Sequence, residues 1–185
     1  MPLERVLVLC RANRCRSPLF EEMLRAEFTR SGAPVLVSSA GFLEAGRAAA
    51  SGSQEEAQRR GLDLGAHRSR RVGPADLRSA DLVLAMGLEH LRDAVALEPG
   101  CWPRAHTVRG LLERARATGP LEGVPDAQRL ARWHEGRRAA DLLRAGAADD
   151  VADPVGGPPA AFAAMGREFD DLVPRVAALV AGRPA

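Results

Sequence analysis

Hydrophobic and polar positions near the start of the chain follow two different patterns in succession. Residues 5–10 read RVLVLC, a short apolar run typical of a strand that is buried on both faces of a parallel sheet. Over residues 17–31, apolar side chains recur along one face of a helix, at Phe20, Met23, Leu24 and Phe28. We expect Ser17 to cap this helix and Pro18 to be its first helical residue. The pattern predicts a strand–loop–helix unit.

The same alternation continues along the rest of the chain. Further strands are predicted at residues 35–39, 82–86 and, more weakly, 104–108, and helices at 54–60, 88–97, 109–117 and 127–145, with a short helix opened by Pro74. A final amphipathic helix carries Phe162, Met165, Phe169, Leu172, Val176 and Leu179. Pro174 inside that helix should kink or divide it.

The predicted fold class is α/β, a single three-layer domain over residues 1–185 with a four-stranded parallel sheet flanked by helices. Residues 109–148 fit the alternation least well, because two helical stretches there are separated by the Gly/Pro-rich break GPLEGVPD. We predict that residues 99–148 are a helical insertion within the domain. Ligands of such sheets bind beyond the carboxyl ends of the strands, so the chemistry is expected at that edge.

Composition narrows the class of protein further. Hydrophobic residues make up 46% and charged residues 27%, which is typical of a globular domain and excludes a disordered chain. No apolar run reaches the roughly 20 residues of a membrane span, and no signal peptide is recognisable, so we expect a cytoplasmic protein that does not bind membranes. The net charge of +2 argues against a nucleic-acid partner. All 26 basic residues are Arg and none is Lys. Arg suits phosphate recognition, but we attribute this composition to the coding bias of a GC-rich genome.

The loop after the first predicted strand holds the densest chemistry of the chain. It reads CRANRCRSP over residues 10–18, a Cys-x5-Arg-Ser pattern between a strand and a helix N-terminus. Successive backbone N–H groups in such a loop form a cradle for a tetrahedral anion, and Arg16 can hold two of its oxygens. The same positive field favours the thiolate of Cys10, which is the nucleophilic form, and Ser17 can donate to its sulfur. The sequence therefore predicts a phosphate-binding loop.

Asn13 falls in the middle of this loop, where a left-handed backbone turn is expected, and Asn tolerates that region better than most residues. The predicted phosphate-binding residues are Arg11, Ala12, Asn13, Arg14, Cys15, Arg16 and Ser17. The structural alternative is that Cys10 is only a buried thiol at a strand end and that Ser17 only starts a helix. That alternative leaves the spacing unexplained.

A second motif supplies a candidate acid. A cysteine that attacks phosphorus needs a group to protonate the departing oxygen. In DVADPVGG, residues 150–157, Pro154 biases Asp153 toward extended geometry, so its carboxylate can project from a loop. Asp149 and Asp150 are the alternative acids, and Asp-Pro also occurs in ordinary turns.

With these residues the chain resembles the low-molecular-weight protein tyrosine phosphatases, whose loop reads Val-Cys-x-Gly-Asn-x-Cys-Arg-Ser-Pro. The resemblance extends through SAG at residues 39–41, GLDL at 61–64, HRSR at 67–70, ADLVLAM at 80–86 and DP at 153–154. It implies a cysteinyl-phosphate intermediate, no metal and no other cofactor. The implied substrate is a phosphorylated protein or a small phosphomonoester, and we expect a monomer or weak homodimer.

The resemblance also assigns roles by position. Cys10 would be the nucleophile, Arg16 the phosphate clamp, and Asp153 the general acid that later activates water. Ser39 and His67 would belong to a buried polar network that holds the loop in shape through Asn13.

Several residues depart from the family pattern and leave the preference for phosphotyrosine open. Ala12 replaces a loop glycine, and Gly87 stands where the family has Asp after Met, which removes one member of the supporting network. Val155 replaces the aromatic residue that walls the pocket, and Phe42 is the candidate replacement, or else a core residue. Arg14 should repel a guanidinium, so phosphoarginine, the substrate of some relatives, ranks lower.

Two other classes of function stay open. Arsenate reductases of this fold relay oxidation to two further cysteines, but only Cys15 and Cys101 remain here. A non-catalytic anion-binding module is the second alternative, favoured by the departures at residues 12, 87 and 155.

A reversible Cys10–Cys15 disulfide would make the enzyme redox-sensitive.

Overall fold

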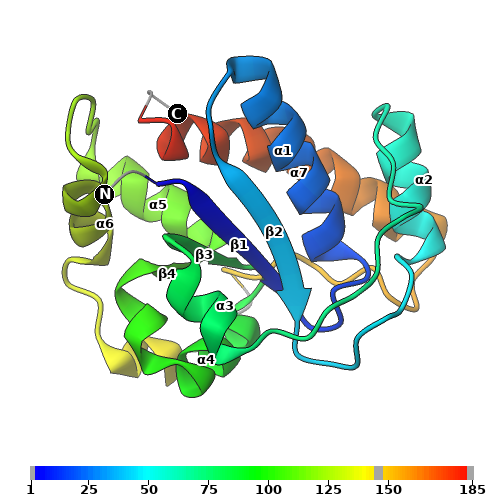
Figure 1. Ribbon diagram of the computed structural model, residues 1–185, viewed down its shortest axis with the longest axis horizontal. Helices are drawn as coiled ribbons and strands as arrows, with labels where there is room; N and C mark the ends of the chain where they lie inside the picture. Colours follow the sequence, from blue (N-terminus) through cyan, green and yellow to red (C-terminus); the bar gives the residue numbers. More distant parts are fainter. Residues whose placement is uncertain (1–2, 144–147, 183–185) are drawn as a thin grey trace.

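A computed structural model describes residues 3–143 and 148–182 and contains one four-stranded parallel sheet. The strand order is β2-β1-β3-β4, and the strands are β1 (Arg5–Cys10), β2 (Leu36–Gly41), β3 (Leu82–Ala85) and β4 (Ala105–Thr107) (Figure 1). All three pairings are parallel. The predicted α/β fold with a four-stranded parallel sheet is confirmed.

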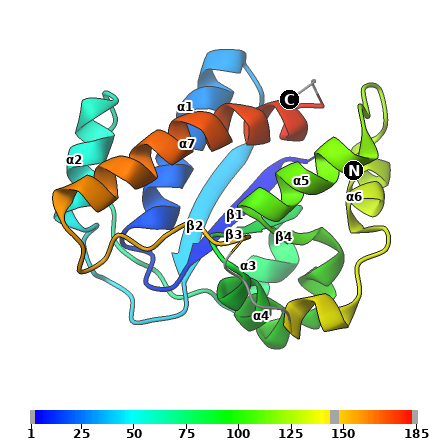
Figure 2. The same cartoon turned by 180° about the vertical axis from the view of Figure 1, so that it is seen from behind.

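Helices cover both faces of the sheet, and β1 shows why. Its alternate residues Val6, Val8 and Cys10 face a core shared with α1 (Arg16–Ser31), α5 (Val108–Thr118) and α7 (Pro159–Val180). Leu7 and Leu9 face a second core shared with α3 (Pro74–Ser79) and α4 (Leu88–Leu97). A strand with both faces buried must be apolar throughout, which explains the continuous apolar run. Figure 2 shows α7 and α5 in front of the sheet, and α2 (Ser51–Arg59) lies beside α7.

The register of the strands places the candidate chemistry at one edge. Cys10 is paired with Gly41 and lies at the carboxyl end of β1, and Leu9 is paired with Ala85 near the end of β3. The loops that follow β1, β2 and β3 therefore leave the same edge of the sheet, as a parallel sheet requires.

The prediction of one helix over residues 127–145 is wrong. The helix α6 spans Asp126–His134, and a separate 3-10 helix, η2, spans Ala139–Leu143; residues 144 and 145 lie outside the described residues. Gly136 has a φ of +74°, a left-handed conformation that ends helices. Arg137 then turns toward the Trp102 ring, with its guanidinium carbon 3.7 Å from the ring centroid. The contact of Arg137 with Trp102 is thus made in place of the helix that the periodicity predicts over these residues.

Pro174, expected to kink or divide the last helix, does not divide it, because α7 runs unbroken from Pro159 to Val180. Phe169 on this helix is fully buried and meets the ring of Phe20 edge-on at 5.0 Å. Burial along the helix outweighs the one backbone hydrogen bond that the proline removes.

The segment predicted as an insertion, residues 99–148, contributes the 3-10 helix η1 (Pro99–Arg104), β4, α5, α6 and η2. It includes one edge strand of the sheet and a helix of the core, and its status as an insertion stays a prediction. Trp133 on α6 is buried. In the part of the chain that the structure describes, no helix has the length and apolar character to cross a bilayer.

Candidate functional site

The loop between Cys10 and α1 forms a cradle of backbone N–H groups. No described residue accepts a hydrogen bond from the N–H groups of residues 12–15. Buried backbone donors are normally paired, so a run of free donors closed by a helix N-terminus is a ready site for an anion. The loop is shaped from outside by Gly41, where an added Cβ would meet the Asn13 nitrogen at 2.7 Å and the Arg11 oxygen at 2.8 Å.

The start of α1 differs from the prediction. The helix begins at Arg16, Cys15 is its N-cap residue, and no side chain caps it, so the expectation that Ser17 is the N-cap is wrong. Ser17 lies inside the helix, fully buried, and its Oγ donates to the Cys10 sulfur at 3.1 Å. The hydroxyl is thus committed to the sulfur, as the sequence predicted for its second role.

Asn13 holds the loop in place through both its backbone and its side chain. Its φ of 52° is the only positive φ of a non-glycine residue among those described, which confirms the predicted left-handed turn. Its side-chain Nδ2 donates to Ser17 Oγ at 3.0 Å and to Ser39 Oγ at 2.7 Å, and its Oδ1 accepts from the Arg70 N–H at 3.0 Å. A buried amide with three partners compensates the strained backbone.

The predicted supporting residues lie around Asn13. The His67 Nε2 is 2.8 Å from the Asn13 carbonyl oxygen. Ser39 Oγ, which accepts from Asn13, donates to Glu21 Oε2 at 2.5 Å. Glu21 and Arg70 also belong to this network and were not among the predicted supporting residues. Glu21 follows Ser17 by four residues on α1, a spacing that places two side chains on the same helix face and could have indicated it.

Arg16 is buried and has an incomplete set of partners. Its Nη2 donates to Asp153 Oδ2 at 2.5 Å and its Nη1 to the Val151 carbonyl at 3.2 Å. Its Nε is buried without a partner among the described residues. An orphaned guanidinium donor beside a loop of free N–H groups matches the fork that binds phosphate oxygens.

The acid motif lies against this guanidinium. The Asp153 side chain is 42% exposed, so it can reach both Arg16 and the solvent. Asp150 instead accepts from the Leu88 N–H at 2.7 Å, and Asp149 lies near Gly110. Of the three carboxylates considered from the sequence, Asp153 is the one paired with Arg16.

The remaining loop residues differ in exposure. Arg11 is exposed, Ala12 is half-buried, and Arg14 donates from its Nε to the Ala48 carbonyl at 2.9 Å. Cys15 is buried, and burial together with the nearby charges of Cys10 and Asp153 raises the pKa of its thiol to about 11. Cys15 therefore stays protonated at neutral pH.

Cys101, one of the two cysteines left for a redox relay, lies on the opposite face of the sheet from Cys10. Cys101 packs in the core with α3 and α4, whereas Cys10 packs in the core with α1 and α7. Burial raises the pKa of the Cys101 thiol, which favours its unreactive form.

The pocket wall that the sequence predicted is only partly in place. Phe42 is half-buried and its ring stacks on the His90 ring at 6.3 Å, so it packs with core residues; its role as a wall stays a prediction. Val155 is 63% exposed. No cluster of His, Cys, Asp and Glu among the described residues has the makeup of a metal site.

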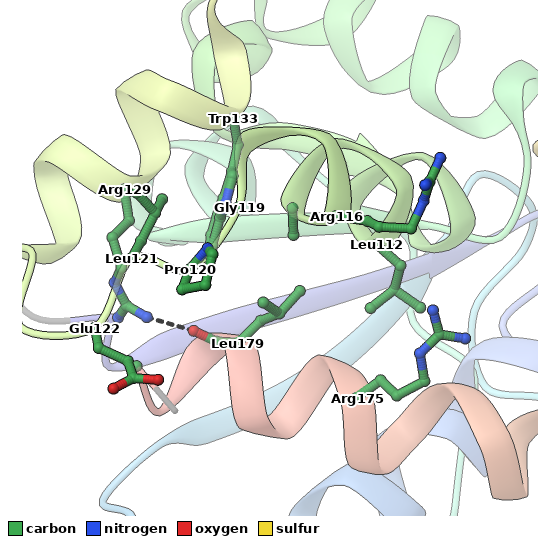
Figure 3. A pocket seen from close by; sticks show the side chains of 12 residues that line it. Leu112, Arg116, Gly119, Pro120, Leu121, Glu122, Arg129, Trp133, Arg175 and Leu179 are labelled. Atoms are coloured by element: carbon green, nitrogen blue, oxygen red, sulfur yellow. Dashed lines mark hydrogen bonds between the residues drawn. The ribbon is translucent and has the colours of Figure 1, made fainter. Parts of the chain in front are cut away.

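A separate cavity lies away from the Cys10 loop. It has a volume of about 380 Å³ between the last turns of α5 and α7, α6 and the loop of residues 119–122 (Figure 3). Its lining contains no cysteine and none of the residues of the Cys10 loop. The candidate active site is the loop that carries Cys10 and Arg16, and Asp153 joins it through the ion pair with Arg16.

Comparison with known proteins agrees with this geometry. Residues 5–127 match the family model described as low molecular weight phosphotyrosine protein phosphatase. The chain is 30% identical over 123 residues to the low molecular weight protein-tyrosine-phosphatase Etp of Escherichia coli (strain K12), a match that covers 66% of this chain and 80% of Etp.

Solved structures are similar over nearly the whole chain. The crystal structure of a low molecular weight protein tyrosine phosphatase from T. tengcongensis has a TM-score of 0.71 at 26% identity and covers 94% of this chain and 97% of that one. The YwlE arginine phosphatase from Geobacillus stearothermophilus has a TM-score of 0.71 at 24% identity, with 96% and 93% covered. The second likeness concerns the fold alone.

The network around Asn13 predicts that replacing Ser39 by Ala weakens binding of inorganic phosphate by about tenfold, because Asn13 Nδ2 and Glu21 lose a buried partner. Calorimetric titration with phosphate measures this effect. Ser38→Ala, one residue earlier on β2 and without a side-chain hydrogen bond among the described residues, is the matched control and should bind like the wild type. Equal affinities for both variants would contradict a role of the network in shaping the loop.

Proposed function

The chain belongs to the low molecular weight phosphotyrosine protein phosphatase family and is a phosphatase, and on this premise we propose that Cys10, Arg16 and Asp153 carry out the hydrolysis. The observation that carries the proposal is the buried Arg16 guanidinium, which pairs with Asp153 and whose Nε has no partner among the described residues. Phosphorylated molecules are the substrates that this family implies.

Substrate binding uses the free donors of the loop. Phosphate oxygens accept from the backbone N–H groups of residues 12–15 and from the Arg16 Nε. The dianion is then held against the positive end of α1, where charge is stabilised without reorganisation of water. The Ser17 hydroxyl, 3.1 Å from the sulfur, stabilises the Cys10 thiolate before attack and when it leaves again.

The reaction proceeds in two displacements. The Cys10 sulfur forms a bond to phosphorus while the bond to the ester oxygen breaks, and Asp153 gives its proton to that oxygen. Water then attacks phosphorus as Asp153 takes back a proton, the sulfur–phosphorus bond breaks, and inorganic phosphate and the thiolate are restored. Every atom comes from the ester, water or the protein, so the proposal needs no cofactor and no metal.

We expect Cys10→Ser to abolish hydrolysis of an aryl phosphate between pH 5 and 7, and Asp153→Ala to slow it by a factor on the order of a hundred or more, since general acids contribute about that much. Cys101→Ser, in the core on the opposite face, is the control and should retain activity. Steady-state kinetics under reducing conditions provide the measurement.

Two outcomes would point to the other functions. A wild type that binds phosphate but does not hydrolyse the ester would be an anion-binding module. Thiol-dependent turnover of arsenate that is lost in Cys101→Ser would support the arsenate reductase hypothesis.

We propose that the substrate is an oxygen ester and that phosphoarginine is a poorer substrate. Arg14 lies in the loop, its charge acts on Cys15, and its Nε is held by the Ala48 carbonyl, so a positive group stays at the loop. A substrate guanidinium would meet like charge there.

Replacing Arg14 by Thr should therefore raise kcat/KM for phosphoarginine relative to an aryl phosphate by about tenfold. Arg132→Thr, an exposed arginine of α6 outside the loop, is the matched control and should leave this ratio unchanged. No gain from Arg14→Thr would remove the electrostatic argument.

The cellular setting is likewise a proposal. The described structure has three free cysteines, Cys10, Cys15 and Cys101, which suits a reducing compartment such as the cytoplasm. We propose a monomer or weak homodimer without a nucleic-acid or membrane partner. A reversible Cys10–Cys15 disulfide as protection against oxidation stays a prediction.

A further inference from the structure

Gly87, between β3 and α4, lies against a carboxylate from a distant part of the chain. Its φ of −172° is extended and open to any residue. An added Cβ would nevertheless lie 2.8 Å from Asp150 Oδ1 and 3.1 Å from Asp150 Cγ. The carboxylate of Asp150 thus fills the space in which a side chain at position 87 would begin.

Asp150 does more than fill this space. Its Oδ1 accepts from the Leu88 N–H at 2.7 Å, at the start of the ten-residue helix α4, whose N-cap residue Gly87 has no side chain of its own. Helix N-termini leave backbone donors unpaired and favour negative charge. The next residue, Val151, donates its N–H to the Met86 carbonyl at 2.8 Å. The segment of residues 150–151 is therefore fastened to residues 86–88 at two points.

The fastened segment leads directly to the acid. The Val151 carbonyl accepts from Arg16 Nη1 at 3.2 Å, and Asp153 pairs with Arg16 Nη2 two residues later. We propose that Asp150 is a positioning residue: it anchors the acid loop to the N-terminus of α4, in the space left by Gly87, so that Asp153 reaches the leaving oxygen. This inference rests on the proposed function.

The test separates acid catalysis from folding. Phenyl phosphate has a poor leaving group that needs a proton from Asp153, whereas 2,4-dinitrophenyl phosphate does not. We expect Asp150→Ala to lower kcat/KM at least tenfold for phenyl phosphate and less than threefold for the dinitrophenyl ester. Asp150→Asn keeps an acceptor for Leu88 and should restore most of the loss. Asp93→Ala, an exposed carboxylate on α4, is the control.

Gly87→Ala supplies an independent arm, because its methyl group would displace the Asp150 carboxylate. It should show the same dependence on the leaving group, and the double variant Gly87→Ala/Asp150→Ala should be no worse than either single variant. Gly73→Ala is the matched glycine control, since its nearest atom is 3.7 Å away and its φ is −122°.

The outcomes distinguish this inference from the proposed function. Equal losses on both esters in Asp150→Ala would show a structural effect only and overturn the positioning role, as would additive effects in the double variant. No turnover of either ester by the wild type would instead overturn the proposed function.

A second inference comes from the cavity of about 380 Å³ and does not depend on the first. Its walls include the apolar side chains Leu112, Leu121, Trp133 and Leu179. Its volume lies in the range of small-molecule sites. Arg129 also lines it, buried, with Nη1 donating to the Leu179 carbonyl and Nε without a partner among the described residues (Figure 3).

Charge at the rim is unevenly distributed. Figure 3 shows Arg116 and Arg175 on one side of the cavity and Glu122 on the other. Arg175 pairs with Asp171, while Arg116 is exposed and has no ion-pair partner among the described residues. We propose that the cavity binds a small amphipathic acid, with its apolar chain between the leucines and Trp133 and its acid group at Arg116.

Calorimetric titration of the whole protein with decanoate tests this proposal. We expect saturable binding of one decanoate, at least tenfold weaker binding of decan-1-ol, and at least fivefold weaker decanoate binding by Arg116→Glu. Arg132→Glu, an exposed arginine of α6 outside the lining, is the matched control. No saturable binding, or equal binding of acid and alcohol, would overturn the proposal.

Discussion

Arg16 carries a positive charge in an almost fully buried position at the first residue of α1, and the rest of the site is arranged around it. A buried charge is costly unless other groups balance it. The Asp153 carboxylate and the Val151 carbonyl supply that balance on one edge of the guanidinium. On the other edge, Nε has no hydrogen-bond partner among the described residues, and an anion would supply one. The same charge therefore holds residues 151–153 beside the Cys10 loop, and its unpaired Nε supports the proposed binding of phosphate there.

The parts of the molecule that could be predicted from sequence are those set by neighbours along the chain. The apolar run of β1 and the left-handed turn at Asn13 follow from local patterning and backbone sterics, and both are present. The loop chemistry from Cys10 to Ser17 is equally local, so the roles proposed for Cys10, Arg16 and the Ser17 hydroxyl follow from one short segment of the sequence. The prediction that Ser17 caps α1 is wrong, because its hydroxyl bonds to the Cys10 sulfur in preference to a backbone N–H.

The parts that escaped prediction depend on contacts between distant segments. Arg70 bonds to Asn13 across 57 residues of sequence, and Asp150 bonds to Leu88 across 62 residues. The periodicity of a helix or strand predicts no contact at such separations. Helix α6 ends early because Arg137 packs on Trp102, and α7 continues past Pro174 because its buried face is held by α1. In each case tertiary burial outweighs a local preference.

Gly41, at the end of β2, constrains the shape of the neighbouring Cys10 loop. Nothing in its own backbone demands glycine, since its φ is not positive; the demand comes from three backbone atoms of residues 11–13 that lie within 2.9 Å of where a methyl group would stand. The end of β2 thus acts as a mould for the anion cradle. The residue type at position 41 is therefore limited by a loop about thirty residues away in sequence. A methyl group there would push residues 11–13 outward and flatten the loop that is proposed to surround the phosphate.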